Sequence, residues 1–476
     1  MPRPLSDDLA PAAPRGRTPP RQAGSRPRAA ALALALAVVL ALGLGTAGAA
    51  RADTLLQVFA LAQHHNPQLR GARAAYAAAL QRVPLARSRL LPQLRASAGV
   101  GDALHDETGN PLLHMFGLGT HWNYLERELA LDATQNLYSP GDEAAVGQAR
   151  LGADLAYARL AQADQSLMVE VAQDYFGLLA ARDSVRSLQR QQDATELQLR
   201  TARAQFAAGH GTILDVRDAQ ARKDLLQAQR IAADNQLQLA HDALQTLVGA
   251  PVGSVAPLLR DARLPQAQGS GVDWARRAER DNLAVTQARL EMAIARLQVR
   301  RAESDGLPTV QAYARLQRAS TSGGGPQFPF GDRVDSASVG VRVQWPLFTG
   351  YGVRSEQAED TALLDKAQDD LDAARSSAAL QARSALAAWT AAQARAQALR
   401  SAVLSSRSAL EANRTGYGAG LRVSVDVLNA TAQLYDTERQ ADQARYDSLL
   451  QALRLKLAAG RLDERDLAEV SALLRP

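Results

Sequence analysis

Cysteine is absent from this chain of 476 residues. Its absence excludes disulfide bonds, thiolate nucleophiles and zinc sites built on thiolates. It also excludes a lipid anchor on an N-terminal cysteine. The fold must therefore be held together by packing and hydrogen bonds.

Long apolar runs are missing after residue 52. No stretch there approaches the roughly 18 continuous apolar residues that a membrane-spanning helix needs. Aromatic residues are scarce, and alanine is abundant. A transporter built from many membrane-spanning helices is therefore excluded.

Residues 1–52 are predicted to be a secretory signal peptide. Arginines between Arg3 and Arg28 precede an uncharged Ala/Leu run, and Ala50-Arg51-Ala52 has the small-x-small form of a cleavage site. The run could anchor the chain in a membrane, but its Gly/Ala-rich second half favours cleavage. This segment carries the whole formal charge of +5, so the rest of the chain gives no case for nucleic-acid binding.

Proline is absent from two long tracts, 141–250 and 347–475. A proline inside a helix costs about 3 kcal/mol, so tracts of this length that are rich in Ala, Leu, Gln and Arg predict helices. Glycines interrupt each tract and can supply a left-handed C-terminal cap. The predicted helices are Gly141–Ala208, Ile213–Val248, Tyr351–Gly416 and Val425–Ala459.

Apolar residues recur every seven positions in the first long helix. One series includes Leu160 and Leu167, and a second includes Val171 and Leu178. The two series are offset by four and three positions, which is the a/d spacing of a coiled coil. A period of 3.5 residues predicts a left-handed supercoil.

The chain also repeats itself. Asn66–Pro92 aligns without a gap with Asn282–Pro308, and Phe206–Val216 aligns with Tyr417–Val427. A repeat of this length should be interpreted before any local motif, because it fixes the architecture. The protein is therefore predicted to be one long unit built twice.

The repeat divides the chain into segments. Each half is expected to open with a helix, Thr54–Leu91 in the first and Val272–Asp305 in the second. The aligned glycines Gly249 and Gly460 lie near the ends of the halves. The predicted organisation is a signal peptide at 1–52, a first structural repeat at 53–250, an equatorial linker at 251–271, a second structural repeat at 272–460 and a C-terminal tail at 461–476.

Between the opening helix and the long helix of each half, apolar and polar residues alternate. This period of two predicts β-strands after Pro92 and after Pro308, with partner strands at Leu125–Leu137 and Ser338–Trp345. The predicted apolar face comprises Leu94, Ala96, Ala98, Val100, Val310, Ala312, Ala314, Leu316, Val339, Val341, Val343 and Trp345. The loops that join the strand pairs are predicted at Asp102–His121 and Arg318–Asp335.

Two structures fit these strands. One is a soluble hairpin at the end of a coiled coil, as in a periplasmic scaffold. The other is part of a transmembrane β-barrel, with apolar side chains toward lipid and polar side chains toward water. Four strands cannot close a barrel, and lipid does not tolerate an open edge, so the barrel requires oligomerisation. Three copies would supply twelve strands.

The order of these features resembles the TolC-type outer membrane channels. The resemblance rests on "RLLPQLRASAGVG" and "DGLPTVQAYARLQ" at the helix-to-strand junctions, "VGVRVQWPLFTGYGVRS" at the return, and "YGAGLRVSVDVLNATAQLYD" at a helix turn. It covers nearly the whole chain after residue 52. Within the family, the chain looks most like the outer-membrane components of type I protein secretion, such as the one that serves cyclolysin export.

The resemblance implies an α+β membrane protein. A homotrimer would form a twelve-stranded outer-membrane β-barrel, continued by a long periplasmic α-helical coiled-coil barrel. An inner-membrane ABC transporter and a periplasmic adaptor would dock at the far end, and an exported protein would pass through. The alternative within the family is the duct of a drug or metal efflux pump.

The resemblance also implies a gate at the periplasmic helix tips. The matching residues are Asp215 on the first turn and Tyr417 and Arg422 on the second, which can make charge-assisted hydrogen bonds. Such bonds are worth about 0 to 1 kcal/mol each when solvated, so a docking partner could break them. The turns themselves are built on Gly209, Gly211 and Gly420.

A carboxylate ring at the narrowest point is a further family feature. Asp426 matches one of its positions, but the second position is Asn429, so the chain departs from a double aspartate ring. Asp218 occupies the equivalent place in the first repeat and could compensate. For each of these residues the alternative is an ordinary solvated helix end.

Other chemistry has little support in the sequence. His105, His114 and His121 fall within one predicted loop, where histidines are usually surface residues rather than metal ligands. No nucleophile-elbow, phosphate-binding or zinc-helix motif is present. The chain is therefore not expected to be an enzyme or to bind a metal or cofactor.

Overall fold

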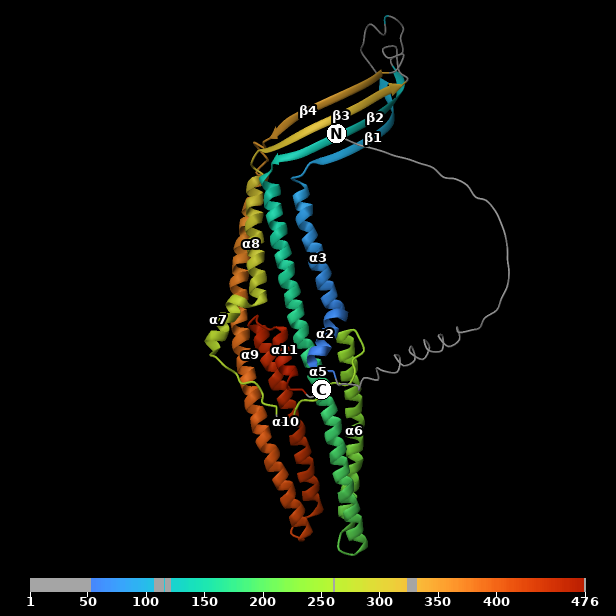
Figure 1. Cartoon of the computed structure of the whole chain (residues 1–476), viewed down its shortest axis with the longest axis vertical. Coiled ribbons are helices and arrows are strands. Elements are labelled where there is room, and N and C mark those ends of the chain that lie inside the picture. Colours follow the sequence, from blue (N-terminus) through green and yellow to red (C-terminus); the bar gives the residue numbers. More distant parts are fainter. Residues whose placement is uncertain (1–52, 107–114, 116–120, 260–261, 323–331, 475–476) are drawn as a thin grey trace, which may run out of the picture. The chain divides into compact units, whose positions relative to one another are not determined.

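The computed structural model describes residues 53–106, 115, 121–259, 262–322 and 332–474 (Figure 1). The predicted signal peptide and parts of the two strand-joining loops lie outside these residues. The described chain consists of helices and one four-stranded sheet. None of its helices has an apolar stretch long enough to cross a bilayer.

The opening helix of each half is divided in two. The four helices are α2 (Leu55–His65), α3 (Pro67–Ser88), α7 (Gly271–Asp281) and α8 (Leu283–Ser304). The breaks fall at Asn66 and Asn282, which align in the sequence repeat. The single helices predicted at Thr54–Leu91 and Val272–Asp305 are therefore wrong.

The asparagine at each break gives the physical reason. Each side chain accepts a hydrogen bond from a backbone N–H in the first turn of the helix that follows, which makes it an N-cap. The Asn66 amide also donates to the carbonyl of Leu247 at 2.7 Å. The Asn282 amide donates to the carbonyl of Ala458 at 2.8 Å. Each break is thus tied to the end of its own half.

Two long helices carry two shorter partners. These four helices are α5 (Pro140–Ala207), α6 (Ile213–Val248), α9 (Gly352–Gly418) and α10 (Ser424–Ala458), close to the predicted limits. The α3 and α6 helices both pack against α5, while α8 and α10 both pack against α9 (Figure 1). The α8 and α10 helices also contact α5, which joins the two halves.

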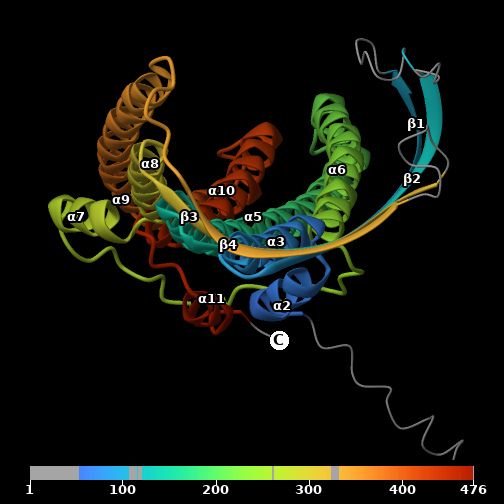
Figure 2. The ribbon, with the colours of Figure 1, turned by 90° about the horizontal axis from the view of Figure 1, so that it is seen from above.

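The strands form one curved antiparallel sheet in the order β1-β2-β3-β4 (Figure 2). Their bounds are β1 (Gln93–Asp106), β2 (His121–Tyr138), β3 (Thr309–Ser322) and β4 (Asp332–Gln344). The strands extend into both predicted loops, so those loop limits are wrong. One reason is the cross-strand pair Arg318–Asp335, which keeps charged residues within the ladder.

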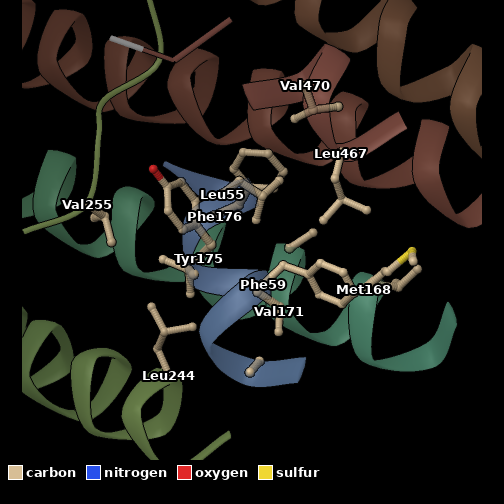
Figure 3. Packing of buried hydrophobic residues seen from close by; sticks show 14 of the residues in the cluster. Leu55, Phe59, Met168, Val171, Tyr175, Phe176, Leu244, Val255, Leu467 and Val470 are labelled. Atoms are coloured by element: carbon tan, nitrogen blue, oxygen red, sulfur yellow. The ribbon is translucent and has the colours of Figure 1, made fainter. Parts of the chain in front are cut away.

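The largest apolar cluster lies where α2, α5, α6, α10 and α11 (Glu464–Ser471) meet the linker (Figure 3). Tyr175 is fully buried there, and its hydroxyl lies 3.0 and 2.9 Å from the carbonyl oxygens of Asp53 and Ala256. Phe176 contacts Tyr175 edge-on and stacks on Tyr446. This cluster fixes α5 and α10 against each other above the helix tips.

Candidate functional site

The two helix hairpins end in turns with the same backbone geometry. Gly209 has a φ of +76° and Gly420 a φ of +72°, a region that favours glycine. The N–H of Gly209 donates to the carbonyl of Phe206 at 3.0 Å, and that of Gly420 donates to Tyr417 at 3.0 Å. The sequence repeat is thus also a structural repeat at the tips.

In the first turn, Asp215 stabilises the start of α6. Its backbone N–H donates to Thr212 Oγ1 at 3.2 Å, and the Thr212 N–H donates to Asp215 Oδ2 at 3.2 Å. This reciprocal arrangement is a capping box. A Cβ on Gly211 would come within 3.1 Å of the backbone of Phe206, so the turn is tight. Within this chain Asp215 is a capping residue.

In the second turn, Arg422 pairs with Asp426 in the first turn of α10. The distance from Arg422 Nη1 to Asp426 Oδ2 is 3.6 Å, and the two side chains are 60% and 34% exposed. The stem of Arg422 lies over Gly416, where a Cβ would come within 2.9 Å of Arg422 Cγ. A residue predicted for the gate and a residue predicted for the constriction are therefore partners.

Tyr417 connects the second turn to the first hairpin. Its hydroxyl lies 2.5 Å from Oε1 of Gln205 on α5. Burial raises the pKa of Tyr417, and the nearby carboxylate of Asp215 adds to the rise. Tyr417 therefore lies close enough to Asp215 to feel its charge, while its hydrogen-bond partner is Gln205. No ion pair between Asp215 and Arg422 occurs within the described part of the chain.

Further contacts join the two hairpins just above the turns. Gln198 on α5 donates to Ser424 Oγ at 3.1 Å, and Arg222 on α6 donates to Asn429 Oδ1 at 3.0 Å. Asp218 is half-buried, and no hydrogen bond or ion pair of its side chain occurs among the described residues. A small apolar cluster completes this junction: Leu199, Val216, Ala219 and Leu428.

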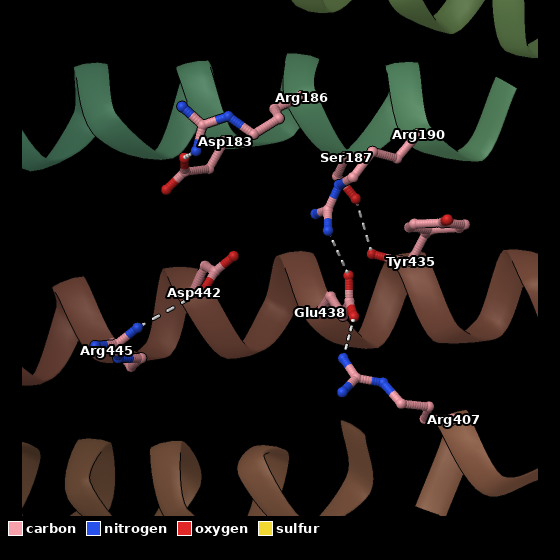
Figure 4. Close-up of polar contacts among 9 residues, drawn as sticks. All are labelled: Asp183, Arg186, Ser187, Arg190, Arg407, Tyr435, Glu438, Asp442 and Arg445. Carbon is pink, nitrogen blue, oxygen red and sulfur yellow. Dashed lines mark hydrogen bonds and ion pairs between the residues drawn. The ribbon is translucent and has the colours of Figure 1, made fainter. Parts of the chain in front are cut away.

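Higher on the hairpins, Glu438 binds two arginines from different helices (Figure 4). Arg190 on α5 approaches Glu438 Oε2 at 3.3 Å, and Arg407 on α9 donates to Oε1 at 2.9 Å. The Glu438 side chain is only 14% exposed. One carboxylate therefore links α10 to both α5 and α9.

Asp442 lies one turn further along α10 (Figure 4). Burial raises the pKa of Asp442 to about 6, and the negative charge of Asp183 adds to the rise. The hydroxyl of Tyr446 is 2.5 Å from Asp183 Oδ2, so these groups meet at the α5–α10 contact. Arg445 lies 4.0 Å from Asp442 and counteracts the rise only weakly.

The sequence did contain a signal for these missed residues. Polar side chains recur at intervals of seven on the faces through which α5 and α10 meet. Asp183 and Arg190 of α5 are seven residues apart and both contact α10. The α10 series is Ser424, Thr431 and Glu438. Ser424 and Thr431 are almost fully buried although they are polar. Polar residues at intervals of seven, next to the apolar heptad positions, would have located the contact between α5 and α10.

The two faces of the sheet differ as predicted. Apolar side chains on one face are open to the surroundings, such as Leu94 at 72% exposure and Val339 at 85%. On the opposite face Arg315 binds Glu128 at 3.0 Å and Asp132 at 3.6 Å. An apolar outer face and a polar inner face are what a transmembrane barrel requires.

The candidate histidines give no site that can be described. The side chains of His105, His114 and His121 lie outside the described residues. Within the described residues, no group of three or more His, Asp or Glu side chains is arranged to hold a metal ion. The functional geometry is therefore that of the tips and the sheet.

Comparisons with known proteins agree with this geometry. The sequence matches the outer membrane efflux protein family over residues 58–250 and 274–461. It is 29% identical to the outer membrane protein TolC of Vibrio cholerae, over 90% of this chain and 95% of that protein. It is 30% identical to the alkaline protease secretion protein AprF of Pseudomonas aeruginosa, over 88% and 86%.

The structure is also similar to that of the outer membrane protein VceC of Vibrio cholerae. The TM-score is 0.70 at 20% identity, and the match covers 85% of this chain and 96% of that one. The fold is that of trimeric channels, in which each chain gives four strands to one barrel and its long helices to the tunnel below. The chain therefore belongs to the outer membrane efflux protein family, whose members are channels of the outer membrane that extend into the periplasm.

Proposed function

We propose that this channel is the outer membrane component of a type I secretion system. It would export a protein together with an inner-membrane ABC transporter and a periplasmic adaptor. The observation that carries this proposal is the 30% identity to a protein whose name assigns it to protease secretion, over 88% of this chain. The cargo, including the suggested cyclolysin, stays a prediction.

A drug or metal efflux duct is the second candidate. It is favoured by the description of the matching family as outer membrane efflux proteins. The tunnel is generic in both cases, because the pump rather than the channel selects the cargo. The two functions therefore differ in their partners and not in the fold of this chain.

For the gate, we infer that the tip contacts hold the two hairpins of each chain together in the closed state. Of the predicted gate residues, Tyr417 and Arg422 stay in the proposed gate, while Asp215 supports it as the cap of α6. The contacts add Gln205 and Arg222 to the proposed gate. Solvated contacts of this kind contribute about 0 to 1 kcal/mol each. An adaptor that binds the tips could replace them, which makes the gate switchable.

For the constriction, we propose that Asp426 contributes one carboxylate per chain to a ring at the tip. Arg422 neutralises part of its charge, since the pair is 3.6 Å apart. Asn429 is engaged by Arg222 and adds no charge to the ring. Asp218 is half-buried on the equivalent turn of α6 and would add three further carboxylates in the trimer.

The partners provide the test of the secretion assignment. The tagged full-length channel is purified from crosslinked cells, and the co-purified inner-membrane protein is identified by mass spectrometry. We expect an ABC transporter with its adaptor, and we expect deletion of the channel to retain one secreted protein inside the cell. Recovery of a proton-driven pump, with unchanged secretion in the deletion strain, would support efflux instead.

A further inference from the structure

Three arginines lie close together on one face of the sheet. Arg127 of β2 pairs in register with Ser320 of β3, and Ser320 pairs with Arg333 of β4. Arg318 is two residues from Ser320 on the same strand, so it shares this face. Arg127, Arg318 and Arg333 are all exposed, and we call them the arginine triangle.

The triangle lies on the apolar face and not on the face that lines the channel. Arg318 pairs in register with Leu129, whose side chain is 56% exposed. The next row on this face consists of Leu131, Leu316 and Ala337. Three guanidinium groups therefore border the surface that faces lipid, which is an unusual place for positive charge.

Its height in the membrane follows from the strand lengths. The long helices and α8 join the sheet at Tyr138, Thr309 and Gln344, so this end faces the periplasm. At about 3.3 Å per residue and a tilt of roughly 40°, Arg127, Arg318 and Arg333 stand about 23 to 28 Å above that end. The apolar band of such barrels is about 25 Å tall, so the triangle lies at headgroup level in the outer leaflet.

The spacing of the triangle suits a phosphate group. Arg127 and Arg333 are two strands apart, about 10 Å, and Arg318 is about 7 Å further along the strand. The short side chain of Ser320 lies between them and leaves space. Guanidinium groups bind phosphate oxygens through two parallel N–H donors.

Two carboxylates accompany the triangle. Asp102 of β1 pairs in register with Leu125, so it lies on the same face one row beyond Arg127. Asp335 accepts hydrogen bonds from Arg318 Nε at 2.6 Å and from Arg318 Nη2 at 2.9 Å. This bidentate pair orients Arg318 and neutralises one positive charge. Three arginines and two carboxylates leave the site with one net positive charge toward the membrane, and Arg333 has no carboxylate opposite it in register. A phosphorylated headgroup would complement that excess.

We propose that the arginine triangle binds the phosphate of an outer-leaflet glycolipid whose acyl chains lie on Leu129, Leu316 and the apolar rows beneath. Charge complementarity and continuity with the apolar face both favour a lipid over a soluble anion. Each trimer would hold three such lipids. The site concerns how the barrel is seated in the membrane, so it does not depend on the cargo or the pump.

Native mass spectrometry of the detergent-solubilised trimer tests the proposal, with diphosphorylated lipid A as the probe. We expect lipid to bind the parent protein and the double variant Arg127→Ser/Arg333→Ser to bind at least tenfold more weakly. The matched control is Arg95→Ser, an exposed arginine on the opposite face of β1, which should bind like the parent. The trimer mass in the same spectrum shows that each variant is assembled.

Two further arms separate the possible sources of binding. The dephosphorylated glycolipid should bind the parent no better than it binds the double variant, because only the phosphate is recognised. The variant Arg127→Lys/Arg333→Lys keeps the charge but loses the paired donors, so its affinity should lie between those of the parent and the serine variant. Equal lipid binding by the parent and the serine variant, or full competition by an equimolar amount of inorganic phosphate, would overturn the proposal.

Discussion

The two helix tips have the same backbone geometry but differ in the residues that surround their aligned carboxylates, Asp215 and Asp426. Thr212 precedes α6, whereas the aligned residue before α10 is Val423. The threonine engages Asp215 in a capping box, while the valine offers no side-chain oxygen. Asp426, which aligns with Asp215, therefore remains available and pairs with Arg422. Two differences between the repeats therefore separate the tips: Thr212 caps one helix where Val423 cannot, and Arg422 gives Asp426 a partner where the first tip has Gly211.

This difference assigns the two tips different tasks. A capped carboxylate stabilises its own helix and contributes little outside it. A carboxylate paired over 3.6 Å with an exposed arginine can change partners when another protein or a cation arrives. The second tip is therefore the better place for a gate, and the first is the surface against which it closes through Gln205.

The largest effect is expected from breaking the contacts between the tips. In Tyr417→Phe/Arg222→Ala, each chain loses two contacts worth about 1 kcal/mol each, and the trimer loses three such sets. The closed state should weaken, so single-channel conductance in planar bilayers should rise severalfold. Asp215→Ala should leave conductance near the parent value, because Asp215 caps its own helix.

The control for this experiment is Arg230→Ala, which removes an arginine of α6. Its partners, Asp234 on α6 and Gln192 on α5, both belong to the first hairpin. Its conductance should equal that of the parent. A rise with Asp215→Ala as large as that of the double variant would contradict the difference between the tips. It would instead indicate that Asp215 acts between chains of the trimer.

Cation block should give the next largest effect. Asp426→Asn removes three carboxylates from the proposed ring, and inhibition of conductance by multivalent cations should weaken about tenfold, or about 1.4 kcal/mol. Asp215→Asn is the matched substitution at the aligned position and should leave inhibition unchanged. Equal weakening by the two variants would show that the ring is not built on Asp426.

The cap itself can be exchanged between the tips. Thr212→Ala should cost about 1 kcal/mol at the start of α6, because an N-cap hydroxyl is lost. Val423→Thr should slow amide hydrogen exchange at the start of α10, since a threonine can engage Asp426 as Thr212 engages Asp215. Hydrogen exchange measured by mass spectrometry would check both variants. Unchanged exchange in Val423→Thr would show that a threonine at this position does not stabilise the start of α10.

The same contrast shows what the sequence could predict. The proline-free tracts and the glycines of the turns located both hairpins closely, since these residues act through the local backbone. The alternation of apolar and polar residues located the four strands, because it also follows from the local backbone. The breaks at Asn66 and Asn282 were missed because an asparagine N-cap becomes decisive only with its distant carbonyl partner.

The partners of the tip residues were harder to predict. Asp215 and Asp426 align in the sequence, and only the structure shows that the hydroxyl of Thr212 separates their roles. The predicted loops were too long at both ends. Arg318 and Asp335 were assigned to a loop, although they form a cross-strand pair. Side-chain partners on different strands or helices cannot be predicted from the pattern of neighbouring residues.

The smallest effect concerns a pair of aligned residues further from the tips. Asp442 of α10 aligns with Ile231 of α6, so only the second repeat has a carboxyl group there. Burial raises the pKa of Asp442 from 3.8 to about 6, so the folded protein binds this proton more tightly than the unfolded chain. Stability should therefore fall as pH rises from about 4 to above 6, as the buried carboxyl ionises. The side chain is 41% exposed, so Asp442→Asn should gain less than about 1 kcal/mol at pH 8 and nothing below pH 4. Thermal unfolding of the trimer at pH 4 and pH 8 checks this prediction. The control is Asp365→Asn at an exposed position, which should leave the unfolding temperature unchanged at both pH values. A gain of equal size at pH 4 would show that packing and not charge is responsible.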